Sequence, residues 1–165
     1  MKEIPGYEGL YAISSQGDVF SVKRGKMLKQ SLNTPGYFFV CLYKDGMRKH
    51  LLTHRLVATT FLPNDKNNKF VDHVDGNTTN NNVINLRWCN YSQNTCNSKK
   101  TTRTCSSLYK GVSLVKSSGK WRVSVSENGK RKNRGHFENE KDAAIAYNKI
   151  AVEIYGGFAR LNDVT

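Results

Sequence analysis

The sequence predicts an α+β protein in three parts: an antiparallel β module, a strand–loop–strand–helix segment, and a three-stranded antiparallel sheet packed on one helix. Two observations predict this class. Short β-like runs alternate with glycine and asparagine turns through most of the chain, and hairpin-type turns favour antiparallel pairing. One long segment, residues 140–155, instead repeats apolar residues at three- and four-residue spacing, which is typical of a helix with one buried face.

The first part, residues 3–62, reads as short strands followed by a short helix. The strand-like runs are residues 11–13, 19–22 and 37–43. The last run ends at Lys44-Asp45-Gly46, a hairpin-type turn, and strand character resumes beyond it. Residues 54–61 then favour a helix that Pro63 closes, because proline cannot continue a helix.

The second part, residues 63–98, is dominated by asparagine. The block from Gly76 to Asn82 holds four asparagines, which excludes regular structure and suits a loop. Short strands at 70–73 and 85–88 flank this loop, and a short helix at 91–97 follows. The predicted order is therefore strand, loop, strand, helix.

A polar, basic linker separates these parts from the C-terminal residues. Beyond the linker come strand-like runs at about 110–115, 121–126 and 131–137. The pair Asn128-Gly129 between the last two is a strong hairpin signal, and Gly156-Gly157 ends the helix at 140–155. The predicted organisation is a β module and strand–loop–strand–helix core over 1–98, a linker over 99–108 and a small domain over 109–165.

The charge of the chain indicates a polyanionic partner. The net charge is +13, from 26 Lys+Arg against 13 Asp+Glu. This exceeds the magnitude of about 2–8 usual for a small domain, so solubility alone explains it poorly. Nucleic acid is the commonest polyanion, while a membrane surface and an acidic protein stay open on charge alone.

Other features of the composition exclude several classes. No apolar run approaches the length that a membrane span needs, and the first residues carry no apolar leader, so we expect an intracellular protein. Cys41, Cys89, Cys96 and Cys105 form no Cys-x-x-Cys pair. We therefore expect ordinary thiols and no structural zinc.

One group of residues suits metal-dependent hydrolysis of a phosphodiester. Asp72 and His73 are adjacent, Asn85 follows on the next strand and Asn94 on the helix. Carboxylate and amide oxygens suit Mg²⁺ or Mn²⁺, and a neutral histidine can take a proton from water. Adjacent strand residues point to opposite faces, so Asp72 and His73 converge only if the strand ends or bulges there. In an asparagine-rich loop a purely local turn role also stays open.

The resemblance to a known family adds to this interpretation. The stretches that carry it are His54–Ala58, Val71–Asn77, Asn82, Asn85–Trp88 and Gln93-Asn94, with Ile4–Ser14 and Gly17–Ser21 upstream. They resemble the HNH homing endonucleases of bacteriophages and the module often found before their nuclease core. One departure is Lys2-Glu3, where that module usually opens with a tryptophan.

The resemblance implies a ββα-metal fold and a role for each matching residue. Asp72 and Asn94 would hold a single Mg²⁺ or Mn²⁺. His73 would be the general base, and Asn85 would orient it. Cleavage of double-stranded DNA would leave a 5′-phosphate and a 3′-hydroxyl.

A second resemblance covers residues 109–163. Tyr109-Lys110-Gly111-Val112, Gly135-His136-Phe137 and Ala146-Tyr147-Asn148 resemble the plant Apetala-2/ethylene-response-factor DNA-binding domain. That family reads bases through arginines and tryptophans on its sheet, and several of those arginines are missing here, so we expect phosphate contact rather than the same target. The residues expected to contact DNA in the whole chain are Arg55, Arg87, Lys99, Lys100, Arg103, Lys110, Ser113, Lys116, Lys120, Arg122, Arg131 and Asn133.

Four neighbours of these residues are given other roles. Asp75 is interpreted as a turn residue rather than a metal ligand. His54, at the start of a short helix, is interpreted as a helix cap or a DNA contact. Trp88 and Trp121 are interpreted as core residues.

The favoured function is thus a DNA endonuclease encoded by a mobile element, acting in the cytoplasm of a bacterial host if phage-encoded. One metal-binding motif per chain favours a monomer. The alternative is a non-catalytic DNA-binding regulator on a nuclease scaffold. An RNA-binding protein is a third alternative, but the chain lacks recognisable aromatic stacking motifs.

Overall fold

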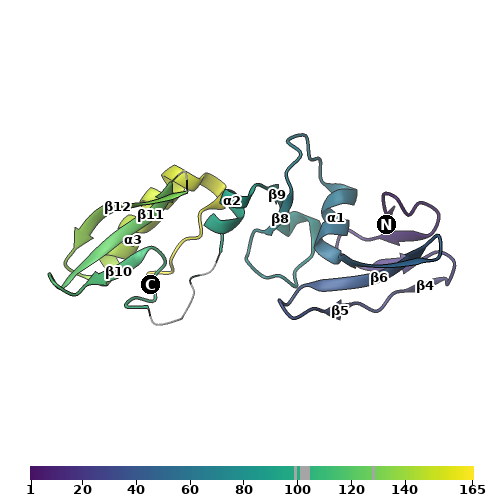
Figure 1. Cartoon of the computed structure of the whole chain (residues 1–165), viewed down its shortest axis with the longest axis horizontal. Helices are drawn as coiled ribbons and strands as arrows, with labels where there is room; N and C mark the ends of the chain where they lie inside the picture. The colour runs from purple at the N-terminus through teal and green to yellow at the C-terminus, as the bar shows by residue number, and fades with distance from the viewer. Residues whose placement is uncertain (99, 101–104, 128) are drawn as a thin grey trace. The chain divides into compact units, whose positions relative to one another are not determined.

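The computed structural model describes residues 1–98, 100, 105–127 and 129–165, and it confirms the mixed helix-and-strand class. The chain divides into two compact units, Met1–Asn90 and Tyr91–Thr165 (Figure 1). The helix predicted at 91–97 therefore clusters with the second unit, although the sequence groups it with residues 1–98.

The first unit opens with a four-stranded antiparallel sheet in the order β1-β2-β3-β4. Its strands are β1 (Lys2–Glu3), β2 (Tyr11–Ile13), β3 (Val19–Ser21) and β4 (Lys26–Met27). The two central strands coincide with the runs predicted from the sequence. The two edge strands are only two residues long, too short to leave a recognisable alternation of apolar and polar residues.

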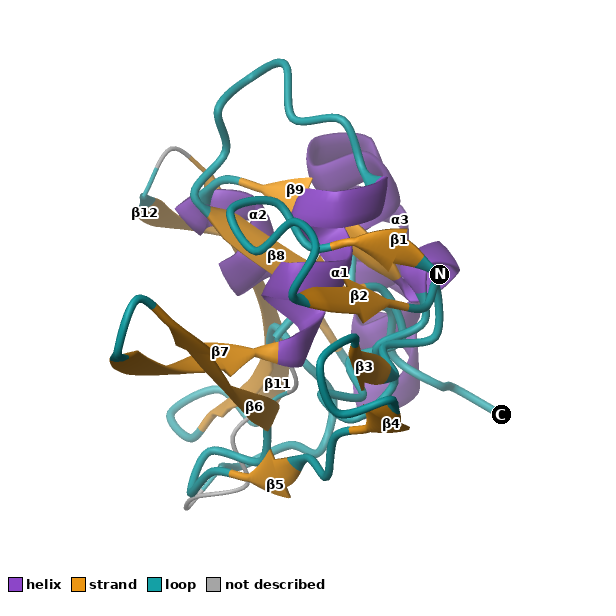
Figure 2. Cartoon of the chain, turned by 90° about the vertical axis from the view of Figure 1, so that its right-hand side faces the viewer, coloured by secondary structure: helices purple, strands orange, loops and turns teal. Residues whose placement is uncertain are grey.

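A three-stranded antiparallel sheet follows, built from β5 (Ser31–Leu32), β6 (Phe38–Lys44) and β7 (Met47–Leu52). The predicted turn joins β6 to β7, with positive φ angles at both Asp45 (52°) and Gly46 (74°). Such φ angles at both central residues match the twist of the flanking strands. Helix α1 (Thr53–Phe61) begins directly where β7 ends (Figure 2).

The core of the first unit lies where α1 meets the strands. Val57 of α1 is fully buried against Val40 and Leu42 of β6, together with Ile13 and Val19 of the first sheet. Burying such side chains stabilises a fold by roughly 1.5–3 kcal/mol each. Trp88 packs against this cluster in a half-buried position, so its interpretation as a core residue is confirmed.

The last strands of the first unit form the hairpin that carries the predicted site. They are β8 (Phe70–His73) and β9 (Leu86–Cys89), which pair antiparallel, with a short 3-10 turn η1 (Val83–Asn85) before β9. The asparagine-rich loop lies between β8 and η1. It is irregular, as predicted.

The second unit comprises α2 (Tyr91–Cys96), the strands β10 (Val112–Val115), β11 (Lys120–Glu127) and β12 (Lys130–Phe137), α3 (Glu140–Tyr155) and the 3-10 turn η2 (Gly156–Phe158). The three strands form one antiparallel sheet in chain order, and α3 covers one of its faces (Figure 1). The described residues include no helix long and apolar enough to cross a membrane.

Small side chains let α3 approach the sheet closely. Ala143, Ala144 and Ala151 of α3 are fully buried against valines of β10 and β11. Gly111 takes a positive φ of 75°, and a Cβ there would lie 2.1 Å from the ring of Tyr147. Trp121 packs against this cluster as predicted for a core residue.

Candidate active site and nucleic-acid interface

Asp72 and His73 occupy the end of β8. Both are buried, with 6% and 4% of their surface exposed. Asp72 lies opposite Arg87 and His73 opposite Leu86 in the β8–β9 register. The strand ends at His73, and the convergence of the two side chains on one site stays a prediction.

The carboxylate of Asp72 is paired with Arg87. Nε and Nη2 of Arg87 donate to Oδ2 of Asp72 at 2.9 and 2.7 Å. Directly opposed residues of an antiparallel pair share a face, which explains the pairing. Arg87 was predicted to contact a DNA phosphate, but in this structure its guanidinium is held by Asp72.

The turn after β8 is organised by Asp75 and Asn85. The Asn85 amide accepts from the Asp75 backbone N–H at 3.0 Å and donates to Oδ1 of Asp75 and to the carbonyl of Asn80, both at 2.9 Å. Desolvation raises the pKa of the Asp75 carboxyl, but hydrogen bonds from Asn77, Asn80 and Asn85 outweigh it and hold the pKa below its ordinary value. Asp75 is thus a turn residue, as its sequence context suggests.

The amide beside His73 belongs to Asn81. Its Oδ1 lies 3.1 Å from Nε2 of His73, and both side chains are buried. The family resemblance implies this hydrogen bond for Asn85, whose amide is instead engaged with Asp75 and Asn80. The physical reason is position: Asn85 precedes β9 and reaches the turn, while the loop folds Asn81 back onto the imidazole.

Two rings pack around the same imidazole. The ring of His54, from α1, lies edge-on to that of His73 with 5.1 Å between centroids, and Tyr37 lies 5.1 Å from His54 and 6.0 Å from His73. Burial, with the nearby His73 and Arg55, lowers the pKa of His54 to about 3. His54 is therefore neutral at physiological pH.

The structure corrects the interpretation of His54. It is buried, and α1 begins after Leu52 with no side-chain capping bond. His54 therefore neither caps the helix nor faces solvent where DNA could reach it. Its Nδ1 has no hydrogen-bond partner among the described residues.

The N-terminal strands support the loop that carries Asn81. Gly17, in the turn between β2 and β3, lies against Asn81 and Thr53, so that a Cβ there would come within 3.1 Å of each side chain. Gln30 joins the same contact, donating to the carbonyl of Gly17 at 2.8 Å and accepting from Thr53 at 2.5 Å. Val83 donates its N–H to the carbonyl of Ser15 at 2.7 Å. Residues of the β module therefore support the loop that carries Asn81 through direct contacts.

The other predicted metal ligand, Asn94, lies half-buried on α2 in the second unit. Its pairing with Asp72 stays a prediction. The donor set, one carboxylate and one amide oxygen, is of the hard type that Mg²⁺ and Mn²⁺ accept.

Two segments in the first half of the chain match known protein families. Residues 2–43 match the NUMOD4 motif, and residues 51–96 match the HNH endonuclease family. The second match contains β8, β9 and α2, and with them Asp72, His73, Asn85 and Asn94. The chain carries an HNH endonuclease domain in these residues.

Its relatives include phage proteins. DNA endonuclease I-HmuI of Bacillus phage SP01 is 46% identical over 87 residues, which are 53% of this chain and 50% of the relative. H-N-H endonuclease F-TflII of Escherichia phage T5 is 40% identical over 87 residues, 52% of this chain and 45% of the relative. The chain thus spans about half the length of these curated relatives.

A solved structure of the HNH homing endonuclease I-HmuI, from a study of its DNA binding and cleavage, matches with a TM-score of 0.56 and 29% identity. The match covers 93% of this chain and 90% of that chain. The predicted resemblance to phage HNH endonucleases is confirmed. The resemblance of residues 109–163 to the ethylene-response-factor domain stays a prediction.

In this HNH protein the sheet of the second unit presents a polar face on the side away from α3. Arg122 of β11 pairs with Ser113 and His136, while Val123, its neighbour, points into the core. The alternation continues along the strands, so Lys120, Arg131 and Asn133 share the face of Arg122. His136 is also exposed on this face. The sequence did not single it out, because only its pairing with Arg122 in the strand register places it there.

The predicted DNA-contacting residues on this face are not all equally exposed. Arg122, Arg131 and Asn133 are exposed, as is Lys116 at the end of β10. Lys120 is exposed and forms a 2.7 Å ion pair with Glu138. The hydroxyl of Ser113 is buried and has no hydrogen-bond partner in the described part of the chain.

The remaining predicted contacts are engaged by the protein or lie outside the described residues. Arg55 donates to the carbonyl of Lys69 at 3.0 Å, although its side chain is exposed. Lys100 donates to the carbonyls of Tyr109 and Val112. Lys110 donates to carbonyls at the end of α2. Lys99 and Arg103 lie outside the described residues.

Proposed function

We propose that this HNH protein is a metal-dependent homing endonuclease that hydrolyses phosphodiester bonds of double-stranded DNA, leaving a 5′-phosphate and a 3′-hydroxyl. The observation that carries the proposal is the buried Asp72-His73 pair at the end of β8, inside the segment that matches the HNH endonuclease family. The phage relatives named as endonucleases, and the net charge of +13, support DNA as the substrate.

In this proposal Asp72 and Asn94 hold one Mg²⁺ or Mn²⁺, which when bound stabilises negative charge on the scissile phosphate and the leaving oxygen. Arg87 holds Oδ2 of Asp72 through two donors, which fixes the orientation of the carboxylate. Orienting a ligand in this way commonly tunes a metal site.

His73 acts as the general base. Oδ1 of Asn81 is an acceptor, so it favours the tautomer with the proton on Nε2 and the lone pair on Nδ1. Nδ1 would then take the proton of the attacking water. The neighbouring rings of Tyr37 and His54 pack against the imidazole and add no charge, since His54 is neutral.

The second unit would hold DNA through the face of its sheet that carries Arg122, Arg131, Asn133 and His136. This placement supports the predicted ethylene-response-factor-like role, because β-sheets can lay one row of side chains along a groove. The scarcity of arginines there favours contacts to phosphates, which position the protein without reading sequence.

Nicking of a supercoiled plasmid tests the proposed activity. The chain is expected to convert the plasmid with Mg²⁺ or Mn²⁺ and to stop when EDTA removes the metal. His73→Ala should lose at least about a hundredfold in rate, the usual contribution of a general base. His50→Ala is the matched control, because His50 is an exposed histidine of the same unit that stacks on Phe39.

The alternative, a non-catalytic DNA-binding regulator, predicts a different pattern. In that case wild type and His73→Ala would be equally inert with either metal, while both still shift a labelled duplex in a gel. That result on DNA that includes the sequence flanking the gene would reject the endonuclease proposal.

A further inference from the structure

Helix α2 has little to stabilise it from within. It is six residues long, Tyr91–Cys96, and none of its residues is buried. Isolated helices shorter than about 12–15 residues are marginal in water, because nucleation is unfavourable. Contacts outside the helix must therefore hold it, and with it Asn94.

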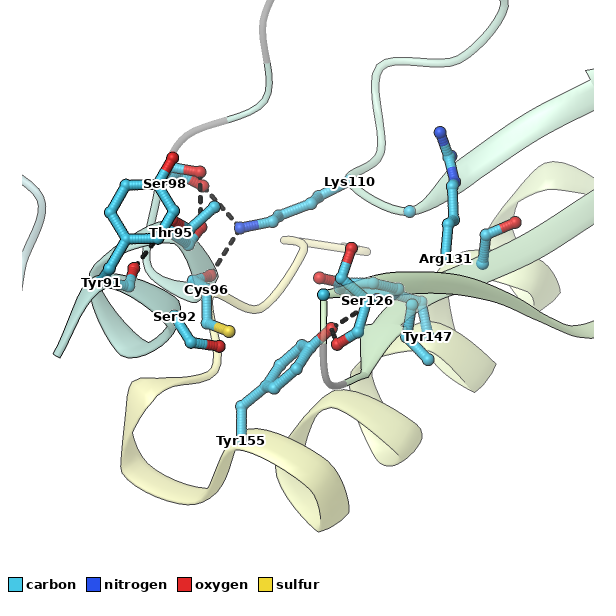
Figure 3. A pocket seen from close by; sticks show the side chains of 14 residues that line it. Tyr91, Ser92, Thr95, Cys96, Ser98, Lys110, Ser126, Arg131, Tyr147 and Tyr155 are labelled. Atoms are coloured by element: carbon cyan, nitrogen blue, oxygen red, sulfur yellow. Dashed lines mark hydrogen bonds between the residues drawn. The ribbon is translucent and has the colours of Figure 1, made fainter.

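One strong contact comes from Lys110. Its Nζ donates to the carbonyl of Cys96 at 2.5 Å and to that of Ser98 at 2.7 Å (Figure 3). The last carbonyls of a helix have no partner within the helix, and a cation there also complements the helix dipole. Lys110 thus caps the C-terminal end of α2.

Backbone hydrogen bonds hold Lys110 itself in the C-terminal domain that contains α3. Its backbone N–H donates to Oδ1 of Asn162 at 2.6 Å, and its carbonyl accepts from Nδ2 of the same residue at 3.1 Å. Asn162 in turn exchanges two hydrogen bonds with Asn148 of α3, at 2.7 and 2.8 Å. The next residue, Gly111, is pressed against the ring of Tyr147. A continuous chain of contacts therefore runs from α3 to the end of α2.

The surroundings of Lys110 suit this use better than contact with a phosphate. Its side chain lines a pocket of about 460 Å³ whose wall includes Thr95, Cys96 and Tyr155 (Figure 3). Burial lowers the pKa of Lys110, and two of its three N–H donors are taken by carbonyls. A lysine whose role is to bind a DNA phosphate would instead be exposed to solvent, as Lys116 and Lys120 are.

We propose that Lys110 is a positioning residue of the nuclease: it fixes α2, and through α2 the predicted metal ligand Asn94, from the C-terminal domain. The inference rests on the proposed function, in which Asn94 binds the metal. It gives the C-terminal domain a second task besides holding DNA.

The test compares Lys110→Met, which keeps the length of the side chain and removes its donors, with Lys149→Met at an exposed lysine of α3. Single-turnover cleavage at saturating DNA should fall about tenfold or more for Lys110→Met and need more Mg²⁺, as for other residues that orient metal ligands. Its Kd for DNA should stay within a factor of about two of wild type at fixed salt. Lys149→Met should leave both the rate at saturation and the Kd close to those of wild type.

Two further measurements keep the test decisive. Lys110→Arg retains donors and should recover part of the rate, whereas a phosphate-contact role predicts that Lys110→Met weakens binding and leaves the saturated rate unchanged, which overturns the proposal. Alkylation by iodoacetamide, followed by peptide mass spectrometry, reports on α2 directly. Rates are compared for the fully deprotonated thiol, because the Lys110 charge lowers the pKa of Cys96 and its removal alone would slow the reaction. On that basis half-buried Cys96 should react faster in Lys110→Met, while Cys41 of the first unit should not change.

The alkylation result also separates this inference from the proposed function. If wild type cleaves no DNA with any divalent metal but Lys110→Met still exposes Cys96, the endonuclease proposal fails and the capping of α2 stands. If the reactivity of Cys96 is the same in both proteins, Lys110 does not hold α2 and the inference fails whatever the activity.

Discussion

Two asparagines near His73 have different tasks. Asn85 bonds Asp75 and Asn80 and so shapes the turn, while Asn81 contacts the imidazole. The sequence could not separate them, because both lie in a loop rich in the same residue and the choice depends on how the loop folds back. The sequence predicted that an amide would contact His73, and the fold places the amide of Asn81 there.

Asn81→Ala should therefore slow cleavage more than it weakens DNA binding. It removes the oxygen that selects the His73 tautomer, and we expect a loss of about 10–100-fold in kcat, as for other residues that orient catalytic groups. Steady-state kinetics in a plasmid-nicking assay measure the loss in kcat. Asn82→Ala is the control, because Asn82 caps η1 without contacting His73. Equal losses in both variants would show that the loop fold, and not the hydrogen bond, matters.

His54 leads to a prediction about stability and pH. Its pKa is about 3 in the folded protein and about 6.5 when unfolded, so below pH 6.5 the unfolded state takes up a proton that the folded state does not. Its contribution to stability is present above pH 6.5 and is lost as the pH falls from about 6.5 towards about 3. The slope approaches about 1.4 kcal/mol for each pH unit in this window.

His54→Phe should remove that slope. The buried Nδ1 has no partner among the described residues, so an apolar ring of similar shape is tolerated there. Urea unfolding at pH 4.5, 5.5 and 7 should show the variant gaining on wild type as the pH falls. A difference in unfolding free energy that does not vary with pH would contradict the prediction, and His50→Phe controls for the loss of an exposed histidine.

At the scale of elements, sequence patterns predicted what depends on local chemistry. The Asp45-Gly46 turn joins β6 to β7, and α3 spans the same residues that the apolar periodicity indicates. Asn139 accepts from the Asp142 N–H at the start of α3, which explains the sharp boundary. The two-residue strands β1, β4 and β5 depend on neighbouring strands instead, so no local pattern predicted them.

Gly17 joins the N-terminal turn to the Asn81 loop, which leads to a prediction about the β module. Its φ is +100°, and a Cβ would lie 3.1 Å from both Asn81 and Thr53. Gly17→Ala should destabilise the fold by about 1–3 kcal/mol and slow cleavage by displacing Asn81. Gly9→Ala is a matched control, since Gly9 has a positive φ of 69° with nothing within 4 Å of its Cβ position.

Thermal unfolding together with kcat separates the two contributions. Gly9→Ala should lose stability through its φ alone and keep its activity at temperatures where it is folded. Should Gly17→Ala cleave DNA as fast as Gly9→Ala does, the β module would have no influence on the site.

At the scale of the whole molecule, the HNH family match and the division into compact units end the first part of the chain at different residues. The HNH endonuclease match runs to residue 96 and includes α2, yet α2 clusters with the second unit. Sequence patterns predicted two parts with a boundary after residue 98, because composition changes there. They could not show the contact of Lys110 with α2, since it joins residues whose side chains carry no pattern in common.

The net charge of +13 leads to a last prediction, on binding. Neutralising DNA phosphates releases counterions, so log Kd should rise linearly with log salt. Arg122 is exposed on the polar face of the sheet, whereas Arg134, twelve residues on, is paired with Glu127 at 2.7 Å. Arg122→Ala should weaken binding on unrelated duplexes to a similar extent and reduce the salt slope by about one, while Arg134→Ala should do neither. Fluorescence anisotropy between low and moderate salt measures both slopes. If Arg122→Ala weakens binding to one sequence only, the sheet reads bases, and the expectation of phosphate contact derived from its missing arginines is wrong.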